Sequence, residues 1–200
     1  MMSFINEAFA GIQNNSLLGG KMNNLEAIAS YILESNLSGD IAECGVYKGG
    51  SARLLSTIFP DKRIFLFDSF QGMLESDTLD KGHVKGDFKD TSLDSVKTYL
   101  SDKPNCSFFP GWLPESASFL TVEKFCFIHI DLDLYQSTKA AIEIFWPRLI
   151  NGGVMVFDDW EWQYCPGVKK SIEEYFNQNI PHIKKINGNV CSVFKLMELV

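Results

Sequence analysis

The chain lacks any paired-cysteine pattern. Its five cysteines are odd in number and scattered, and no two of them are spaced as CxxC. This distribution argues against a disulfide framework and against a zinc site, and it is typical of reduced thiols in a cytosolic protein. We therefore expect a cytoplasmic location.

Long apolar runs and an excess of basic residues are also missing. No apolar stretch reaches the roughly 20 residues that a membrane-spanning helix needs, and the first residues show no basic segment followed by an apolar core, as a signal peptide would. The 18 Lys and Arg are outnumbered by 25 Asp and Glu, which leaves a net charge of −7. Because phosphate groups are neutralised by a basic face, this balance argues against nucleic acid as a partner.

Apolar segments and helical patterns alternate along the chain, which predicts a parallel sheet. Helical spacing predicts helices over about 23–36, 50–59, 93–100, 135–149 and 167–177. The last two β segments flank Asn187-Gly188, a hairpin signal. We predict one doubly wound α/β domain with a mostly parallel, seven-stranded, Rossmann-like sheet and an antiparallel C-terminal edge strand. The polar segment 69–90 is too long for a plain connection and is expected to be functional.

Acidic residues stand at the ends of the predicted strands. Asp68, Asp131 and the pair Asp158-Asp159 follow three of them, and Glu43 lies at the tip of a fourth. A single acid there would be read as a helix cap or a solvated loop start. Because ligands of an open α/β sheet bind at the carboxyl ends of its strands, five acids at one edge indicate a functional site.

A glycine-rich turn, residues 43–51, connects the first predicted strand to a helix. Its glycines let backbone amides approach a ligand closely, but their spacing does not match GxGxxG, which disfavours a dinucleotide-binding dehydrogenase. Asp68 follows Gly45 by 23 residues, about the distance at which a second strand delivers an acid to ribose hydroxyls. This combination fits S-adenosylmethionine better than NAD. Trp112 is either a cover for the adenine or a packing residue.

A second group of acids comprises Asp131, Asp133, Asp158 and Asp159. A few carboxylate oxygens suit a hard divalent cation, Mg²⁺ or Ca²⁺. His129 lies on the same side of its predicted strand as Asp131, and we interpret it as a hydrogen-bonded core histidine.

Four motifs, in order, resemble the macrocin O-methyltransferase (TylF-like) family. They are Glu43-x-Gly45-Val46-x-x-Gly49-Gly50-Ser51, Asp68-Ser69-Phe70-x-Gly72-Met73, Ile130-Asp131-Leu132-Asp133-Leu134-Tyr135-x-Ser137-Thr138 and Gly152-Gly153-Val154-x-x-x-Asp158-Asp159. The later run Pro166-Gly167-Val168-Lys169-Lys170 is similar too, so the resemblance covers about residues 40–195. It implies a class I methyltransferase fold and Mg²⁺-dependent methylation of sugar hydroxyls on natural products.

The resemblance also implies roles for individual residues. Asp131, Asp158 and Asp159 would hold the metal. The chemistry of methyl transfer, rather than the resemblance, requires a general base, either Asp131 or Asp133, and we favour Asp131 because it stands at the strand end. Residues 1–38 would form an N-terminal helical lead-in packed on the domain, and residues 39–200 the S-adenosylmethionine-binding catalytic domain. The predicted cofactor contacts are Glu43, Gly45, Val46, Tyr47, Lys48, Gly49, Gly50, Ser51, Asp68, Ser69, Phe70, Trp112 and Asp131.

Two other functions stay open at this point. One is a metal-independent N- or O-methyltransferase of a small molecule, in which the paired aspartates only position the substrate. The other is an inactive cofactor-binding chain that serves as a partner subunit, since fold does not guarantee function. The expected partner is a small-molecule acceptor, a sugar or glycoside. We expect neither nucleic acid nor a membrane, and a homodimer is compatible with the sequence.

Overall fold

A computed structural model describes residues 20–74, 79–80, 82–177 and 182–196. Its strands form one sheet in the order β3-β2-β1-β4-β5-β7-β6, where β1 to β5 run parallel and β7 is antiparallel to both of its neighbours. The predicted sheet is confirmed, and the antiparallel strand β7 lies one place in from the edge strand β6. The strands are β1 (Asp40–Cys44), β2 (Ile64–Asp68), β3 (Cys106–Pro110), β4 (Phe125–Ile130), β5 (Leu149–Phe157), β6 (His182–Asn187) and β7 (Val190–Lys195).

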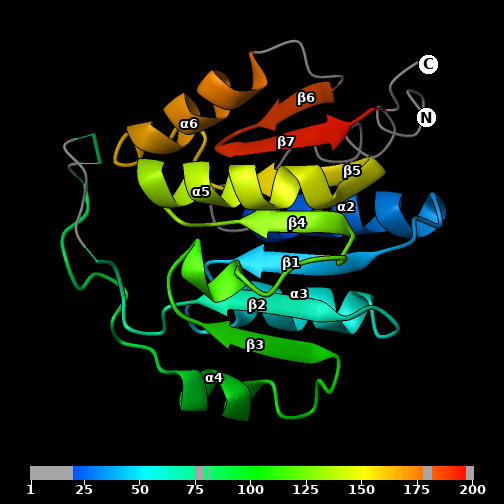
Figure 1. The fold of residues 1–200 in the computed structure, drawn as a ribbon, viewed down its shortest axis with the longest axis horizontal. Helices are drawn as coiled ribbons and strands as arrows, with labels where there is room; N and C mark the ends of the chain where they lie inside the picture. Colours follow the sequence, from blue (N-terminus) through cyan, green and yellow to red (C-terminus); the bar gives the residue numbers. More distant parts are fainter. Residues whose placement is uncertain (1–19, 75–78, 81, 178–181, 197–200) are drawn as a thin grey trace.

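Helices cover both faces of this sheet. In Figure 1, α5 lies in front of the strands, and α2 and α3 lie behind them. The helix predicted over 135–149 ends earlier, because Pro147 has no N–H to continue it and a short 3₁₀ turn follows. None of the described helices is both long and apolar enough to cross a bilayer. The helical segments are α2 (Gly20–Glu34), α3 (Gly50–Ile58), α4 (Leu93–Tyr99), η1 (Glu115–Ala117), α5 (Tyr135–Phe145), η2 (Trp146–Arg148) and α6 (Pro166–Phe176).

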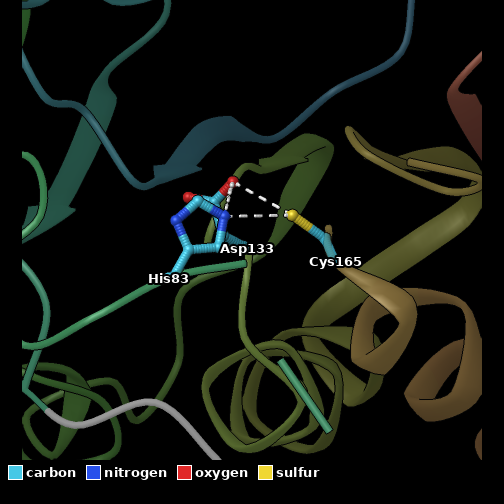
Figure 2. A group of neighbouring side chains, drawn as sticks. All are labelled: His83, Asp133 and Cys165. Carbon is cyan, nitrogen blue, oxygen red and sulfur yellow. Dashed lines mark hydrogen bonds and ion pairs between the residues drawn. The ribbon is translucent and has the colours of Figure 1, made fainter. Parts of the chain in front are cut away.

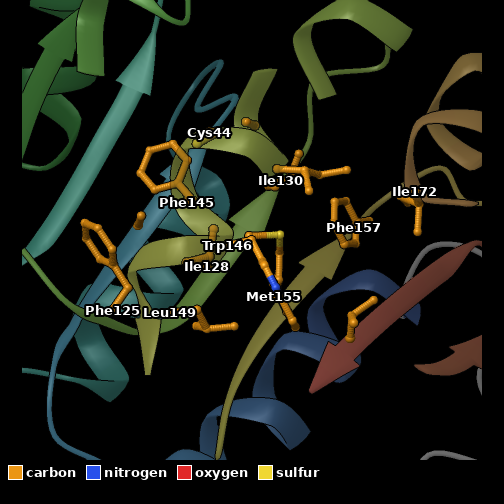
Figure 3. Close-up of a cluster of buried hydrophobic side chains, with 14 of the residues drawn as sticks. Cys44, Phe125, Ile128, Ile130, Phe145, Trp146, Leu149, Met155, Phe157 and Ile172 are labelled. Atoms are coloured by element: carbon orange, nitrogen blue, oxygen red, sulfur yellow. The ribbon is translucent and has the colours of Figure 1, made fainter. Parts of the chain in front are cut away.

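The core has two parts, one on each face of the sheet. Alternation along β5 sends Met155 and Phe157 toward α5 and α6, where they pack with Phe145 (Figure 3). Val154 faces the other way, into the cluster that contains Leu55 of α3. All five side chains are fully buried, and each such burial is worth about 1.5–3 kcal/mol. The two clusters fix the sheet between its helices and so fix the positions of its strand ends.

The ends of β1 and β4 are in unusually close contact. Gly45, which follows β1, has a φ of +90°, and a Cβ added there would lie 1.8 Å from the carbonyl oxygen of Asp131. The amide of Asp131 in turn donates to the carbonyl of Cys44 at 2.8 Å. Only glycine allows this approach, which brings the glycine-rich turn against the acidic residues that follow β4.

Of the predicted N-terminal lead-in, residues 1–19 lie outside the described part of the chain. The rest contains α2, which begins at Gly20, three residues before the predicted start. Buried Leu25, Ile28 and Ile32 attach this helix to the same cluster as Leu55. The helix therefore packs on the sheet, and its first turn is held near the strand ends.

Candidate active site

A cavity of about 680 Å³ opens at the carboxyl ends of the central strands. The strand ends contribute Gly45, Asp68, Asp131 and Asp158, and the first turn of α2 contributes Lys21. Described parts of the long segment 69–90, the turn after β3 and the start of α5 form the rest of the wall. The volume lies in the range of small-molecule sites, and the position is the one that open α/β sheets use for ligands.

Asp68 holds the glycine-rich turn in place. Its Oδ2 accepts hydrogen bonds from the amides of Val46 at 2.7 Å and Tyr47 at 2.8 Å. Its Oδ1 accepts from the amide of Phe70 at 2.6 Å. Tyr47 has a φ of +50° and Phe70 a φ of +54°, so these bonds stabilise backbone that would otherwise be strained. Asp68 also lines the cavity, so its predicted contact with a ribose is compatible with its position.

The side chain of Glu43 lies away from the cavity in which its predicted cofactor contact would be made. It is fully buried and does not line the cavity. Its Oε1 lies 3.0 Å from Nδ1 of His129, while its Oε2 has no hydrogen-bond partner in the described part of the chain. Glu43 is thus a core partner of His129, and a direct side-chain contact with the cofactor is not supported. The interpretation of His129 as a hydrogen-bonded core histidine is confirmed.

The other predicted cofactor contacts divide into two groups. Lys48 points away and pairs with Asp90 at 2.5 Å. Gly49 has a φ of +85°, and an added Cβ would meet Val96 of α4 at 3.1 Å, so this glycine serves the packing of the turn. Val46, Gly50, Ser51 and Phe70 likewise do not line the cavity, whereas Gly45, Tyr47, Asp68, Ser69, Trp112 and Asp131 do.

Lys21 connects the acids that follow β4 and β5. Its ammonium is hydrogen bonded to Oδ2 of Asp131 and lies 2.6 Å from Oδ2 of Asp158. Burial alone lowers the pKa of Lys21, but the charges of Asp131 and Asp158 raise it further than burial lowers it. Lys21 therefore carries a full positive charge between these two carboxylates.

Asp133 and Asp159 leave negative charge in excess at the same place. Carboxylate oxygens of Asp131, Asp133 and Asp159 lie within 4.8 Å of one another. Burial, followed by the charge of Asp131, raises the pKa of Asp133 to about 6. Burial and the charges of Asp158 and Asp133 raise the pKa of Asp159 to about 8. Closely spaced hard oxygen donors with unbalanced charge fit a divalent cation such as Mg²⁺.

The sequence profile of the macrocin O-methyltransferase (TylF) family matches residues 13–194. The chain belongs to this family. It is 28% identical over 163 residues to the 8-demethyl-8-(2,3-dimethoxy-alpha-L-rhamnosyl)-tetracenomycin-C 4'-O-methyltransferase of Streptomyces olivaceus, a match that covers 72% of this chain and 62% of the relative. It is 24% identical over 171 residues to the demethyldecarbamoylnovobiocin O-methyltransferase of Streptomyces niveus, with 78% and 64% covered. The chain thus spans less than two thirds of the length of either relative.

The fold agrees with that of a solved structure whose sequence is more distant. The O-methyltransferase NovP superposes with a TM-score of 0.77 at 22% identity, over 88% of this chain and 80% of NovP. The TylF-family chain therefore has the Rossmann-like methyltransferase fold predicted from its alternating pattern.

The sequence pattern did not predict the roles of two residues in or near this TylF-family site. Lys21 is a single lysine in the first turn of a helix, 110 residues from Asp131. Asp80 lies in the long polar segment and is fully buried. Its Oδ2 accepts from the amide of Tyr135 at 2.7 Å and its Oδ1 from the amide of Gly167 at 2.9 Å. Asp80 thus holds segment 69–90 against the starts of α5 and α6, where free backbone amides need acceptors.

Proposed function

We propose that the chain is an S-adenosylmethionine-dependent, Mg²⁺-dependent O-methyltransferase that acts on a hydroxyl of a sugar or glycosylated small molecule. The observation that carries this proposal is the cavity, whose wall joins the glycine-rich turn after β1 to the carboxylates after β4 and β5. One end suits the cofactor, and the other suits a cation with an oxygen-bearing acceptor. The name of the S. olivaceus relative, which specifies a rhamnosyl group and O-methylation, supports a sugar acceptor.

Methyl transfer requires alignment of the acceptor oxygen, the methyl carbon and the sulfur. The acceptor oxygen bonds to the methyl carbon as the carbon–sulfur bond breaks, and the hydroxyl proton leaves. Asp68 fixes the glycine-rich turn that would hold the cofactor. Asp131, Asp158 and Asp159 would hold the metal, which supplies a Lewis acid that lowers the pKa of a bound hydroxyl. The chain's own task is to hold both reactants in line and accept the proton.

Asp133 is better placed than Asp131 to accept that proton. Oδ2 of Asp131 is paired with Lys21, whereas Asp133 lines the cavity without a lysine partner among the described residues. Asp133 also has a φ of +60°, an unfavourable conformation for a residue other than glycine that is often retained at functional sites. The geometry therefore supports Asp133 as the general base, although its place in the sequence favoured Asp131.

The test is methyl transfer from S-adenosylmethionine to candidate glycosides, followed by mass spectrometry. Excess EDTA should abolish transfer and added Mg²⁺ should restore it, while calorimetry shows cofactor binding little changed. Asp159→Asn removes one charge and should raise the Mg²⁺ concentration needed for half-maximal activity. The matched control is Asp61→Asn, which changes an exposed aspartate in the turn after α3 and should behave as the unchanged protein does.

Lys21 favours one alternative, a metal-independent methyltransferase. Its ammonium already lies between Asp131 and Asp158, where it balances part of the charge that a cation would balance. In that case the lysine and the aspartates would only position the acceptor. Full activity in excess EDTA would establish this alternative and exclude the metal mechanism, while leaving the methyltransferase assignment intact.

A further inference from the structure

A histidine and a cysteine lie beside the carboxylate of Asp133. Figure 2 shows His83, from segment 69–90, and Cys165, at the start of α6, turned toward the carboxylate of Asp133. His83 Nε2 lies 3.3 Å from Cys165 Sγ. Cys165 Sγ lies 3.7 Å from Asp133 Oδ1, and His83 Nε2 lies 4.0 Å from the same oxygen. One nitrogen, one sulfur and one oxygen therefore converge from three separate segments.

These spacings approach the edges of a tetrahedral metal site. With Zn–S near 2.3 Å and Zn–N or Zn–O near 2.0–2.1 Å, tetrahedral ligands stand about 3.5 Å apart across the sulfur edges and about 3.3 Å apart across the nitrogen–oxygen edge. The two sulfur edges here already measure 3.3 and 3.7 Å. The nitrogen–oxygen edge, at 4.0 Å, would have to close by about 0.7 Å, a shift that side-chain rotation can supply.

The second ring nitrogen of His83 lies close to a carboxylate. Its Nδ1 lies 3.4 Å from Oδ2 of Asp87, and Asp87 is itself fixed by the amide of Val84 at 3.0 Å. Histidines that bind metals commonly donate the other ring N–H to a carboxylate, which fixes the tautomer and orients the ring. A proton on Nδ1 leaves the lone pair of Nε2 directed at Cys165 and Asp133.

Cys165 is fully buried but has no role in capping its helix. It occupies the residue before α6, and its side chain makes no capping hydrogen bond. Burial, together with the negative charges of Asp133 and Asp159, raises the pKa of its thiol, so the metal-free cysteine is neutral. The same negative charges would attract a divalent cation, and binding would release the thiol proton to solvent.

We propose that His83, Asp133 and Cys165 form a site for a borderline-soft divalent transition metal such as Zn²⁺, with ligands different from Asp131, Asp158 and Asp159 of the neighbouring Mg²⁺ site. Three protein ligands leave a fourth position for water. A cation bound there occupies Oδ1 of Asp133 and prevents this carboxylate from accepting the proton of the acceptor. The expected inhibition of methyl transfer rests on the proposed function. The metal-binding site itself does not. The spacing of the cysteines alone had argued against any zinc site.

Cobalt titration tests the site directly. Metal-free protein is titrated with Co²⁺ alone, and thiolate-to-cobalt charge transfer is followed by near-ultraviolet absorption. The unchanged protein should develop this band, and Cys165→Ser should not. Cys106→Ser, which changes a more accessible cysteine, should keep the band. Loss of a ligand in His83→Gln should weaken Co²⁺ binding by more than tenfold, and Asp87→Asn by about tenfold.

A band that persists in Cys165→Ser, or that never forms in the unchanged protein, would overturn the site. Cys165→Ala provides a second variant, and thermal unfolding of both variants checks that they fold. With saturating Mg²⁺, added Zn²⁺ should inhibit methyl transfer by the unchanged protein and spare Cys165→Ser. Equal inhibition of the unchanged protein and Cys165→Ser would refute the proposal that zinc at this site blocks proton transfer to Asp133. Absence of methyl transfer under any condition would count against the proposed function alone, because the cobalt band needs no acceptor.

Discussion

Replacement of Lys21 by methionine should strengthen metal binding rather than weaken it. The ammonium of Lys21 is paired with Asp131 and Asp158, two of the proposed metal ligands, so a cation must displace it from both. The side chains are 34% exposed for Lys21, 23% for Asp131 and 13% for Asp158. At that exposure each pair is worth about 1 kcal/mol. Removal of both pairs should therefore tighten Mg²⁺ binding by about 2 kcal/mol, or roughly 30-fold.

Calorimetric titration of Mg²⁺ into the metal-free protein measures this change. Without metal, Lys21→Met should lower the free energy of unfolding in urea by about 2 kcal/mol, because the same two pairs are lost and the carboxylates repel one another. Saturating Mg²⁺ should remove that difference. Lys97→Met, which changes an exposed lysine on α4, is the matched control and should alter neither quantity.

The reasoning about Lys21 would be refuted by a Mg²⁺ affinity that falls or stays the same in Lys21→Met. A fall would mean that the lysine holds α2 in the position that completes the metal site. No change would mean that its ion pairs exert no competition with the cation.

Three further substitutions test the framework of the site. Asp80→Ala removes the acceptor for two helix-start amides, one of them that of Gly167, and should cost about 2–4 kcal/mol of unfolding free energy in urea; a loss below 1 kcal/mol would contradict the account. Gly45→Ala places a Cβ on the carbonyl oxygen of Asp131 and should cost about 3 kcal/mol or more, whereas normal thermal stability would show that β1 and β4 can separate. Asp68→Ala should weaken binding of S-adenosylhomocysteine by about 10- to 150-fold in calorimetry, and an unchanged affinity would assign the role elsewhere.

The position of the site could be predicted because it depends on local order along the chain. Each apolar strand ends directly at its acid, so Asp68, Asp131 and Asp158 had to meet at one edge once the strands were parallel. The direction of a particular side chain could not be predicted in this way. Glu43 lies one residue before the end of β1, and that single step turns its side chain into the core against His129.

Residues whose partners are distant in sequence were beyond prediction for a different reason. Asp133, His83 and Cys165 come from segments far apart in the sequence, and Asp80, three residues before His83, is bonded to the starts of α5 and α6. A rule that counts cysteine spacing considers one short stretch at a time, and a site with one cysteine, one histidine and one aspartate leaves no such local pattern. The bonds of Asp80 hold His83 beside Asp133, so a metal on His83 would contact the carboxylate of Asp133 directly. Coupling between the proposed transition-metal site and catalysis would therefore need only side-chain movement.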